Sequence, residues 1–178
     1  MGLLIWIILT RKLVFFLLKW INNNGWLYLK LKRNLFYLFF PLLVGGLSAL
    51  FSGSFSIYSS INKPLFSPPG YIFGIIWPIL YLLMGISFYY IKKDNYILNN
   101  ACFWYYLQLS FNFLWSIIFF RFRMFSFAVV VLVLLIISVI ITFIKFRQIN
   151  KEASNYLIPY IIWILFAFYL NLGVVVLN

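Results

Sequence analysis

Long apolar runs separated by short polar joints dominate this chain. Five such runs cover residues 35–55, 70–91, 101–120, 125–146 and 155–177. Each approaches the roughly 20 apolar residues that a membrane-spanning helix needs, and none shows the strict alternation typical of a membrane β-barrel. Because backbone polar groups inside a bilayer must be satisfied internally, such runs form helices. The pattern predicts an all-α membrane protein, a bundle of five transmembrane helices.

The connections between these runs are of two kinds. Three are short and polar, with the sequences KKDNYILNN, RFRM and RQINKEASN, and they predict antiparallel neighbouring helices. The connection between the first and second runs is longer and reads SIYSSINKPLFSPP over residues 56–69. Pro64, Pro68 and Pro69 restrict it to extended or turn geometry. We expect this proline-rich loop to cover one mouth of the bundle.

Residues 1–34 form an N-terminal extension to the five-helix domain, which is assigned to residues 35–178. Two short apolar stretches in the extension are interrupted by Arg11, Lys12 and Lys19. These bases fall within about a third of a helical circumference, and Trp6 and Trp20 flank them, as in a helix that lies in the membrane interface. A signal peptide is disfavoured because positive charge does not precede the apolar part. The extension therefore predicts an interfacial helix.

Composition agrees with a multi-pass integral membrane protein, without specifying the membrane. The chain is 66% hydrophobic and 9% charged, and its 14 Lys+Arg against 2 Asp+Glu give a formal net charge of +12. In a membrane protein such bases anchor loops to anionic headgroups, so the lipid bilayer is the expected partner. No run of bases is dense enough to indicate a nucleic-acid partner.

The second run carries aromatic and small residues on one helical face. Gly70, Gly74, Trp77, Tyr81 and Met84 follow each other at three- and four-residue spacing. Trp77 lies about a third of the way into the run, where its indole N–H needs a partner inside the protein. This favours a cavity wall over a lipid-facing belt of aromatic side chains, although simple packing would produce the same face.

The third and fifth runs place tryptophan beside asparagine. One face of the third run carries Gln108, Asn112, Trp115 and Phe119, and one face of the fifth carries Trp163, Ala167, Leu170 and Asn171. Amide side chains are costly in hydrocarbon and should face the bundle interior, either as ligand contacts or as bonds between helices. Aromatic walls with a few amide groups suit a flat, mostly apolar ligand.

Small residues recur every four positions in the first run, at Gly45, Ala49 and Gly53. Such a stripe lets another helix approach closely, and it fits packing within the chain and a dimer contact equally well.

Several kinds of chemistry lack their usual groups. The chain has no histidine, its acids Asp94 and Glu152 fall in predicted connections, and Cys102 is its single cysteine. Acid–base catalysis, a proton relay in the membrane and a metal centre are therefore disfavoured. We expect no metal and no cofactor.

Three linked motifs resemble one known family. They read KPLFSPPGYIFGIIWPILYLLMG from residue 63, QLSFNFLWSIIFF from residue 108 and PYIIWILFAFYLN from residue 159. Their residue types and order, over about residues 36–178, are similar to the translocator proteins, also called tryptophan-rich sensory proteins or peripheral-type benzodiazepine receptors (TspO/MBR). The resemblance implies a homodimer, and a pocket under the first loop for porphyrins and other hydrophobic small molecules.

The resemblance also implies roles for particular residues. With the helical faces above, the expected ligand-binding residues are Trp77, Tyr81, Asn112, Trp115, Trp163, Ala167, Leu170 and Asn171. The expected loop lid consists of Pro64, Phe66, Pro68, Pro69 and Tyr71, with Phe66 and Tyr71 standing where relatives usually have tryptophan. Some bacterial members degrade porphyrin with light and oxygen by means of two tryptophans. These match Trp77 and Trp163, which are catalytic candidates only for that reaction.

Three functions follow as alternatives. The first is a membrane protein that binds tetrapyrroles and similar flat hydrophobic ligands, in a sensory or transport role. The second is light- and oxygen-dependent porphyrin degradation, which needs no acid or base. The third is a ligand-independent role in membrane assembly through the small-residue stripe.

Overall fold

A computed structural model of the chain describes residues 34–53, 57–92 and 99–178. The chain divides into two compact units, Met1–Phe36 and Tyr37–Asn178. Almost all of the first unit lies outside the described residues, and the predicted interfacial helix lies there with it. That helix therefore stays a prediction, and the architecture below is that of the second unit.

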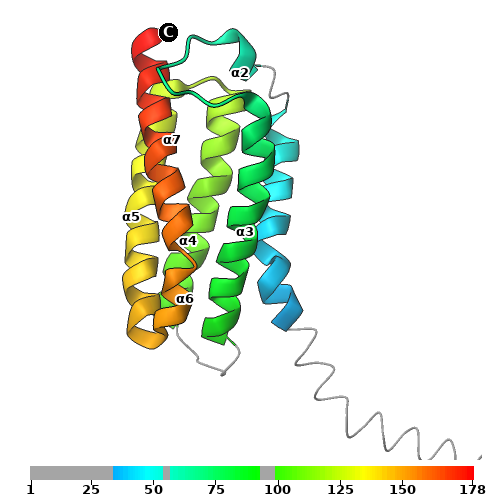
Figure 1. The fold of residues 1–178 in the computed structure, drawn as a ribbon, viewed down its shortest axis with the longest axis vertical. Coiled ribbons are helices and arrows are strands. Elements are labelled where there is room, and N and C mark those ends of the chain that lie inside the picture. Colours follow the sequence, from blue (N-terminus) through cyan, green and yellow to red (C-terminus); the bar gives the residue numbers. More distant parts are fainter. Residues whose placement is uncertain (1–33, 54–56, 93–98) are drawn as a thin grey trace, which may run out of the picture. The chain divides into compact units, whose positions relative to one another are not determined.

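The described residues are almost entirely helical, and they contain no strand. A first helix, Asn34–Ser52, is drawn in blue to cyan in Figure 1 and carries no label. The elements after it are α2 (Ile57–Ser60), α3 (Gly70–Lys92), α4 (Asn99–Ser116), the π-helical η1 (Ile117–Arg121), α5 (Phe125–Ile149), α6 (Lys151–Asn155) and α7 (Ile158–Leu177). The prediction of an all-α protein is confirmed.

Four helical segments are long and apolar enough to cross a membrane: Asn34–Ser52, Gly70–Lys92, Phe125–Ile149 and Lys151–Leu177. The predicted third span, residues 101–120, is also helical and forms most of α4 and η1. It is not among these four, because Asn99, Asn100, Gln108 and Asn112 reduce the hydropathy of α4. Multi-pass membrane insertion is thus supported, while the count of five spans stays a prediction.

The predicted polar connection over residues 147–155 is wrong. Arg147 to Ile149 continue α5, and residues 151–155 form α6. Asn150 alone separates the two helices, and its side-chain Oδ1 accepts from the backbone N–H of Ala153 at 3.1 Å. Asparagine is a favoured N-cap residue because its side chain satisfies a free N–H of the first turn. The polar residues after Asn150 therefore start a helix.

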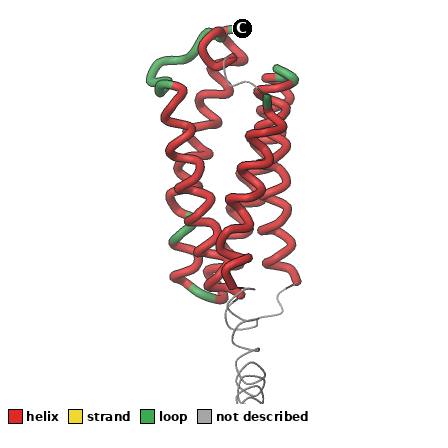
Figure 2. The backbone as a smooth tube through the Cα atoms, turned by 90° about the vertical axis from the view of Figure 1, so that its right-hand side faces the viewer, coloured by secondary structure: helices red, strands yellow, loops and turns green. Residues whose placement is uncertain are grey.

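The helices of the second unit pack side by side, with their connections at the two ends (Figure 2). α4 packs against α5, α5 against α7, and α3 against α6 and α7. The first helix meets α3 where Gly85 lies against the backbone of Leu38. It meets α4 through the hydroxyl groups of Ser52 and Ser116, whose Oγ atoms are 2.7 Å apart. The first helix is thus held between α3 and α4.

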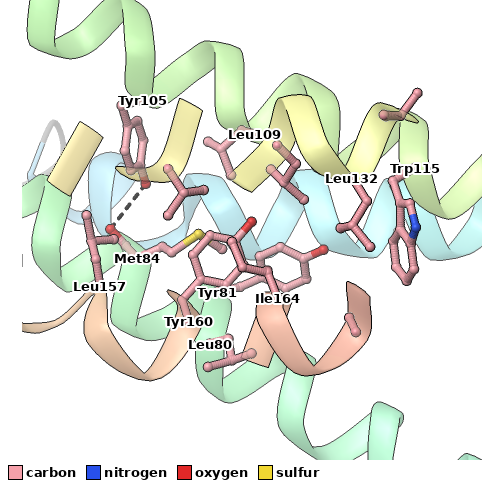
Figure 3. Packing of buried hydrophobic residues seen from close by; sticks show 14 of the residues in the cluster. Leu80, Tyr81, Met84, Tyr105, Leu109, Trp115, Leu132, Leu157, Tyr160 and Ile164 are labelled. Atoms are coloured by element: carbon pink, nitrogen blue, oxygen red, sulfur yellow. Dashed lines mark hydrogen bonds between the residues drawn. The ribbon is translucent and has the colours of Figure 1, made fainter. Parts of the chain in front are cut away.

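An aromatic core fixes the end of the bundle at which α3 finishes. The rings of Phe88 and Tyr105 stack with centroids 4.1 Å apart, and Phe146 of α5 lies 5.7 Å from Tyr105. The Tyr105 hydroxyl donates to the backbone oxygen of Met84 at 3.1 Å, the bond drawn in Figure 3. All four residues are fully buried. This closely packed end leaves the opposite end, nearer the start of α3, for the cavity described next.

Candidate ligand-binding site

A cavity of about 940 Å³ lies at the end of the bundle where α3 begins. Its walls come from the first helix, from α2 and the loop after it, from α3, and from α4 and η1. Residues of α5 and α7 do not line it. Small-molecule sites usually have volumes of about 300–1,000 Å³ and mostly apolar walls with a few polar groups. The hollow is large enough for one ligand of that size.

Trp77 stands at the centre of the aromatic wall. Its ring stacks on Tyr81, with centroids 5.5 Å apart, and lies 6.1 Å from the ring of Trp115. All three residues line the cavity, as does Asn112. Four of the eight predicted ligand-binding residues are therefore brought together at one surface. Pro78, which also lines the cavity, lacks the N–H that would bond to the carbonyl of Gly74 one turn earlier.

A chain of hydrogen bonds crosses three helices at the floor of the cavity. The Tyr81 hydroxyl donates to Oδ1 of Asn112 at 2.6 Å, and Nδ2 of Asn112 donates to the Tyr160 hydroxyl at 3.0 Å. The side chains of these residues, from α3, α4 and α7, are buried. The amide is therefore held in one orientation, and it presents a fixed polar group beneath an aromatic wall.

The four predicted residues of α7 lie behind the wall and do not line the cavity. Asn171 accepts from Nε1 of Trp115 at 3.1 Å through Oδ1, and it donates to the backbone oxygen of Phe125 at 3.2 Å through Nδ2. Ala167 and Leu170 are buried in the bundle. In this structure the amide of Asn171 positions Trp115, so its contribution to the site is indirect. Direct ligand contact by these residues stays a prediction.

Trp163, the fourth of these residues, lies one layer behind the cavity. Phe73 lines the cavity, and its ring packs against Trp163 with centroids 5.7 Å apart. The rings of Trp163 and Trp77 are perpendicular, with centroids 6.5 Å apart. Nε1 of Trp163 is buried, and the described residues offer it no acceptor. The two catalytic candidates are thus neighbours, but only Trp77 faces the cavity.

Only some residues of the predicted lid line the cavity. Pro68, Pro69 and Tyr71 line the cavity, whereas Pro64 and Phe66 do not. Pro64 instead packs against Gly173 of α7. Phe66 has a positive φ of 64° and is 86% exposed, so its ring points away from the protein.

Hydrogen bonds tie the loop to the end of α7. The backbone N–H of Asn62 donates to Oδ1 of Asn178 at 3.0 Å, and Nδ2 of Asn178 donates to the backbone oxygen of Asn62 at 3.0 Å. The Tyr169 hydroxyl donates to the backbone oxygen of Leu65 at 2.8 Å. Within the loop, the Tyr58 hydroxyl donates to the backbone oxygen of Pro68 at 2.8 Å. Partial burial raises the pKa of Tyr58, so this donor stays protonated at neutral pH.

Replacing Gly173 by alanine should loosen the loop. A Cβ at this position would collide with the ring of Pro64, so the loop must move away from α7. The bonds between Asn62 and Asn178 should then weaken, and hydrogen–deuterium exchange over residues 57–69 should become faster. Gly74→Ala is the matched control, because a Cβ at Gly74 has nothing within 4 Å. Equal exchange in the two variants would show that Pro64 does not anchor the loop.

Sequence reasoning missed the wall that the first helix contributes. Gly45, Gly46, Ser48 and Ala49 line the cavity. Of the predicted stripe Gly45, Ala49 and Gly53, the first two line the cavity and a Cβ at Gly53 meets nothing within 4 Å; a dimer contact stays a prediction. A Cβ at Gly45 would collide with the Tyr81 ring, so glycine makes room for that side chain. Periodicity alone gave no signal for the role of these residues, because small side chains carry no chemistry of their own.

Comparison with known proteins assigns the chain to a family. A sequence model described as the TspO/MBR family matches residues 37–177. The chain belongs to the TspO/MBR family. The tryptophan-rich protein TspO of Archaeoglobus fulgidus is 39% identical over 137 residues, which cover 72% of this chain and 88% of that protein. The translocator protein of Bos taurus is 32% identical over 137 residues, covering 74% and 81% of the two chains.

The family assignment confirms the resemblance drawn from the three motifs. A third relative, protein CrtK of Rhodobacter capsulatus, is 33% identical over 138 residues, or 75% of this chain and 85% of the relative. The TspO/MBR match begins at residue 37, so it leaves out the N-terminal extension. Together with the apolar helices it establishes an integral, multi-pass membrane protein. A porphyrin ligand and a homodimer stay predictions.

Proposed function

We propose that this protein crosses the membrane five times and binds a flat, largely apolar molecule, such as a tetrapyrrole, in the cavity. The main support is the aromatic surface in which Trp77 stacks on Tyr81 and lies beside Trp115, next to the Tyr81–Asn112–Tyr160 chain of hydrogen bonds. A planar ligand gains most from flat aromatic walls, because offset stacking and burial of apolar area act together. The fixed amide at the floor would orient the ligand.

The α4 helix is the fifth span in this proposal. Two of the amide side chains that lower its hydropathy, Gln108 and Asn112, are each 1% exposed and so are hidden inside the bundle, while the exposed Asn100 stands at the start of the helix. Its outward residues, Phe103, Tyr106 and Leu114, are apolar or aromatic and exposed, as expected for a helix in contact with lipid.

The proposal predicts that partly filling the cavity weakens binding. A Gly74→Leu side chain would project into the cavity, since a Cβ there meets open space. Protoporphyrin added to the purified protein should quench tryptophan fluorescence, and Gly74→Leu should weaken its binding by about tenfold, or about 1.4 kcal/mol. Ser110→Leu is the control, because Ser110 is exposed on α4 and does not line the cavity.

The outcomes are distinct. Equal affinity of the two leucine variants, or no quenching of the unmodified protein, would reject the cavity as the site. Loss of the porphyrin absorption band only under light and oxygen would add the degradation reaction to binding. Both variants should keep the thermal unfolding temperature of the unmodified protein within a few degrees, which separates lost binding from lost folding.

A further inference from the structure

The mouth of the cavity carries one charge. Among the described residues that line the cavity, Lys63 alone is a basic or acidic residue, and the rest are apolar, aromatic or neutral polar residues. Lys63 lies in the loop between α2 and α3. The site thus has a cationic end at the loop and a neutral amide at the floor, with aromatic rings between them.

Local bonds hold the Lys63 ammonium beside the cavity. Its Nζ donates to the backbone oxygen of Tyr58 at 2.8 Å and to that of Ile61 at 3.4 Å, and it lies 5.1 Å from the centroid of the Tyr58 ring. An ammonium group has three donors, so one remains for another partner. The bonds between Asn62 and Asn178 fix the neighbouring residue, which limits how far Lys63 can move.

In the described part of the chain, no acidic side chain lies beside this charge. Of the two acidic residues, Glu152 lies on α6, at the end of the unit opposite to the loop (Figure 1), and Asp94 lies outside the described residues. A lysine at the rim of an apolar cavity is stabilised by a counterion, because neighbouring low-dielectric walls strengthen the interaction. A ligand or the membrane can supply this counterion.

We propose that Lys63 selects ligands with a carboxylate at one edge of a flat apolar body. The carboxylate would accept a hydrogen bond from the third N–H of Lys63 at the loop. The flat body would lie against Trp77 and extend toward Asn112. Gly70 and Tyr81 are 11 positions apart on α3, a rise of about 16 Å, so the loop end and the floor of the cavity are well separated. This inference rests on the proposed function, and it adds the ligand's charge and its direction in the cavity.

Binding of a porphyrin dicarboxylic acid and of its dimethyl ester tests the inference. Both are titrated by tryptophan quenching into protein held in nanodiscs of zwitterionic phosphatidylcholine. The unmodified protein should bind the acid about fivefold more tightly than the ester, the size expected for one partly exposed charge pair. Lys63→Gln should remove this preference and leave ester affinity unchanged. Lys63→Arg should keep the preference, as should Arg123→Gln, which removes an exposed charge outside the cavity lining.

Each other outcome has a definite meaning. If the unmodified protein binds acid and ester equally, Lys63 does not recognise the carboxylate, although the proposed function stands. If neither compound binds, the proposed function itself fails. The same titrations in nanodiscs containing anionic phosphatidylglycerol examine the membrane as the source of the counterion. If Lys63→Gln changes only the response to anionic lipid, and not the preference for acid over ester, Lys63 pairs with headgroups and the inference is overturned.

Discussion

Replacing Gly85 by alanine is expected to lower the free energy of unfolding by about 1–3 kcal/mol, the usual cost of an overpacked core. A Cβ at Gly85 would collide with the backbone oxygen of Leu38 and would lie 2.7 Å from the Leu38 carbonyl carbon. The Leu38 atoms belong to the backbone of the first helix, and the Cβ would be attached to the backbone of α3, so no side chain can rotate to relieve the clash. The first helix and α3 must move apart, which also opens the neighbouring contact between Gly45 and Tyr81.

Unfolding in mixed micelles of increasing denaturing detergent, followed by tryptophan fluorescence, measures this loss. Gly74→Ala is the control, since it makes the same chemical change in the same helix where a Cβ meets nothing within 4 Å. Alanine is the better helix former, so the control should be neutral or slightly more stable, by up to about 1 kcal/mol. Equal stability of the two variants would mean that the first helix does not lie tightly against α3 at Gly85.

Hydropathy and breaker residues predicted the helices well. The second and fourth predicted runs, 70–91 and 125–146, begin at the first residues of α3 and α5. These boundaries follow from proline and polar residues that stop a helix locally, so the sequence contains them directly. The connection at 147–155 was mispredicted because polarity was taken as a sign of a loop. The capping bond of Asn150 to Ala153 decided the local structure instead.

The cavity shows where such reasoning stops. Periodicity placed Gly70, Gly74, Trp77 and Tyr81 on one face, and all four line the cavity. It equally placed Trp163 and Asn171 on one face of α7, but it does not say which neighbour meets that face. In the structure Phe73 lines the cavity and Trp163 packs against it, while Asn171 bonds to Trp115. Only the packing of whole helices separates a wall residue from the residue supporting it.

The roles of small residues are the second feature that the sequence did not predict. Gly45 and Gly85 carry no functional group, yet they set how closely the first helix approaches α3. A glycine on a membrane helix predicts close approach in general, without identifying the partner helix. Gly45 also lines the cavity, so one glycine serves both helix packing and the site. Two residues of the predicted stripe, Gly45 and Ala49, therefore line the cavity, which the spacing of small residues could not indicate.

Replacing Asn112 by leucine is expected to lower the free energy of unfolding by about 1–2 kcal/mol, although the number and branching of the side-chain heavy atoms are kept. The amide accepts from Tyr81 and donates to Tyr160, and all three groups are buried. Leucine leaves two phenol hydroxyls without these partners, and an unpaired buried hydroxyl costs more than its bond contributed. Detergent-induced unfolding gives the loss, and porphyrin affinity should fall in the same variant because the polar floor disappears.

A double-mutant cycle with Tyr81→Phe separates this bond from general packing. In the unmodified protein, Tyr81→Phe removes the donor at 2.6 Å from Asn112; after Asn112→Leu it removes only an unpaired hydroxyl. The second change should therefore cost less, giving a coupling of about 1 kcal/mol. Tyr105→Phe is the control, because its hydroxyl bonds to the Met84 backbone and should add independently. Zero coupling for Tyr81 would mean that the bond to Tyr81 does not fix the amide of Asn112. A ligand would then have no fixed polar group at the cavity floor to set its direction between Asn112 and the loop.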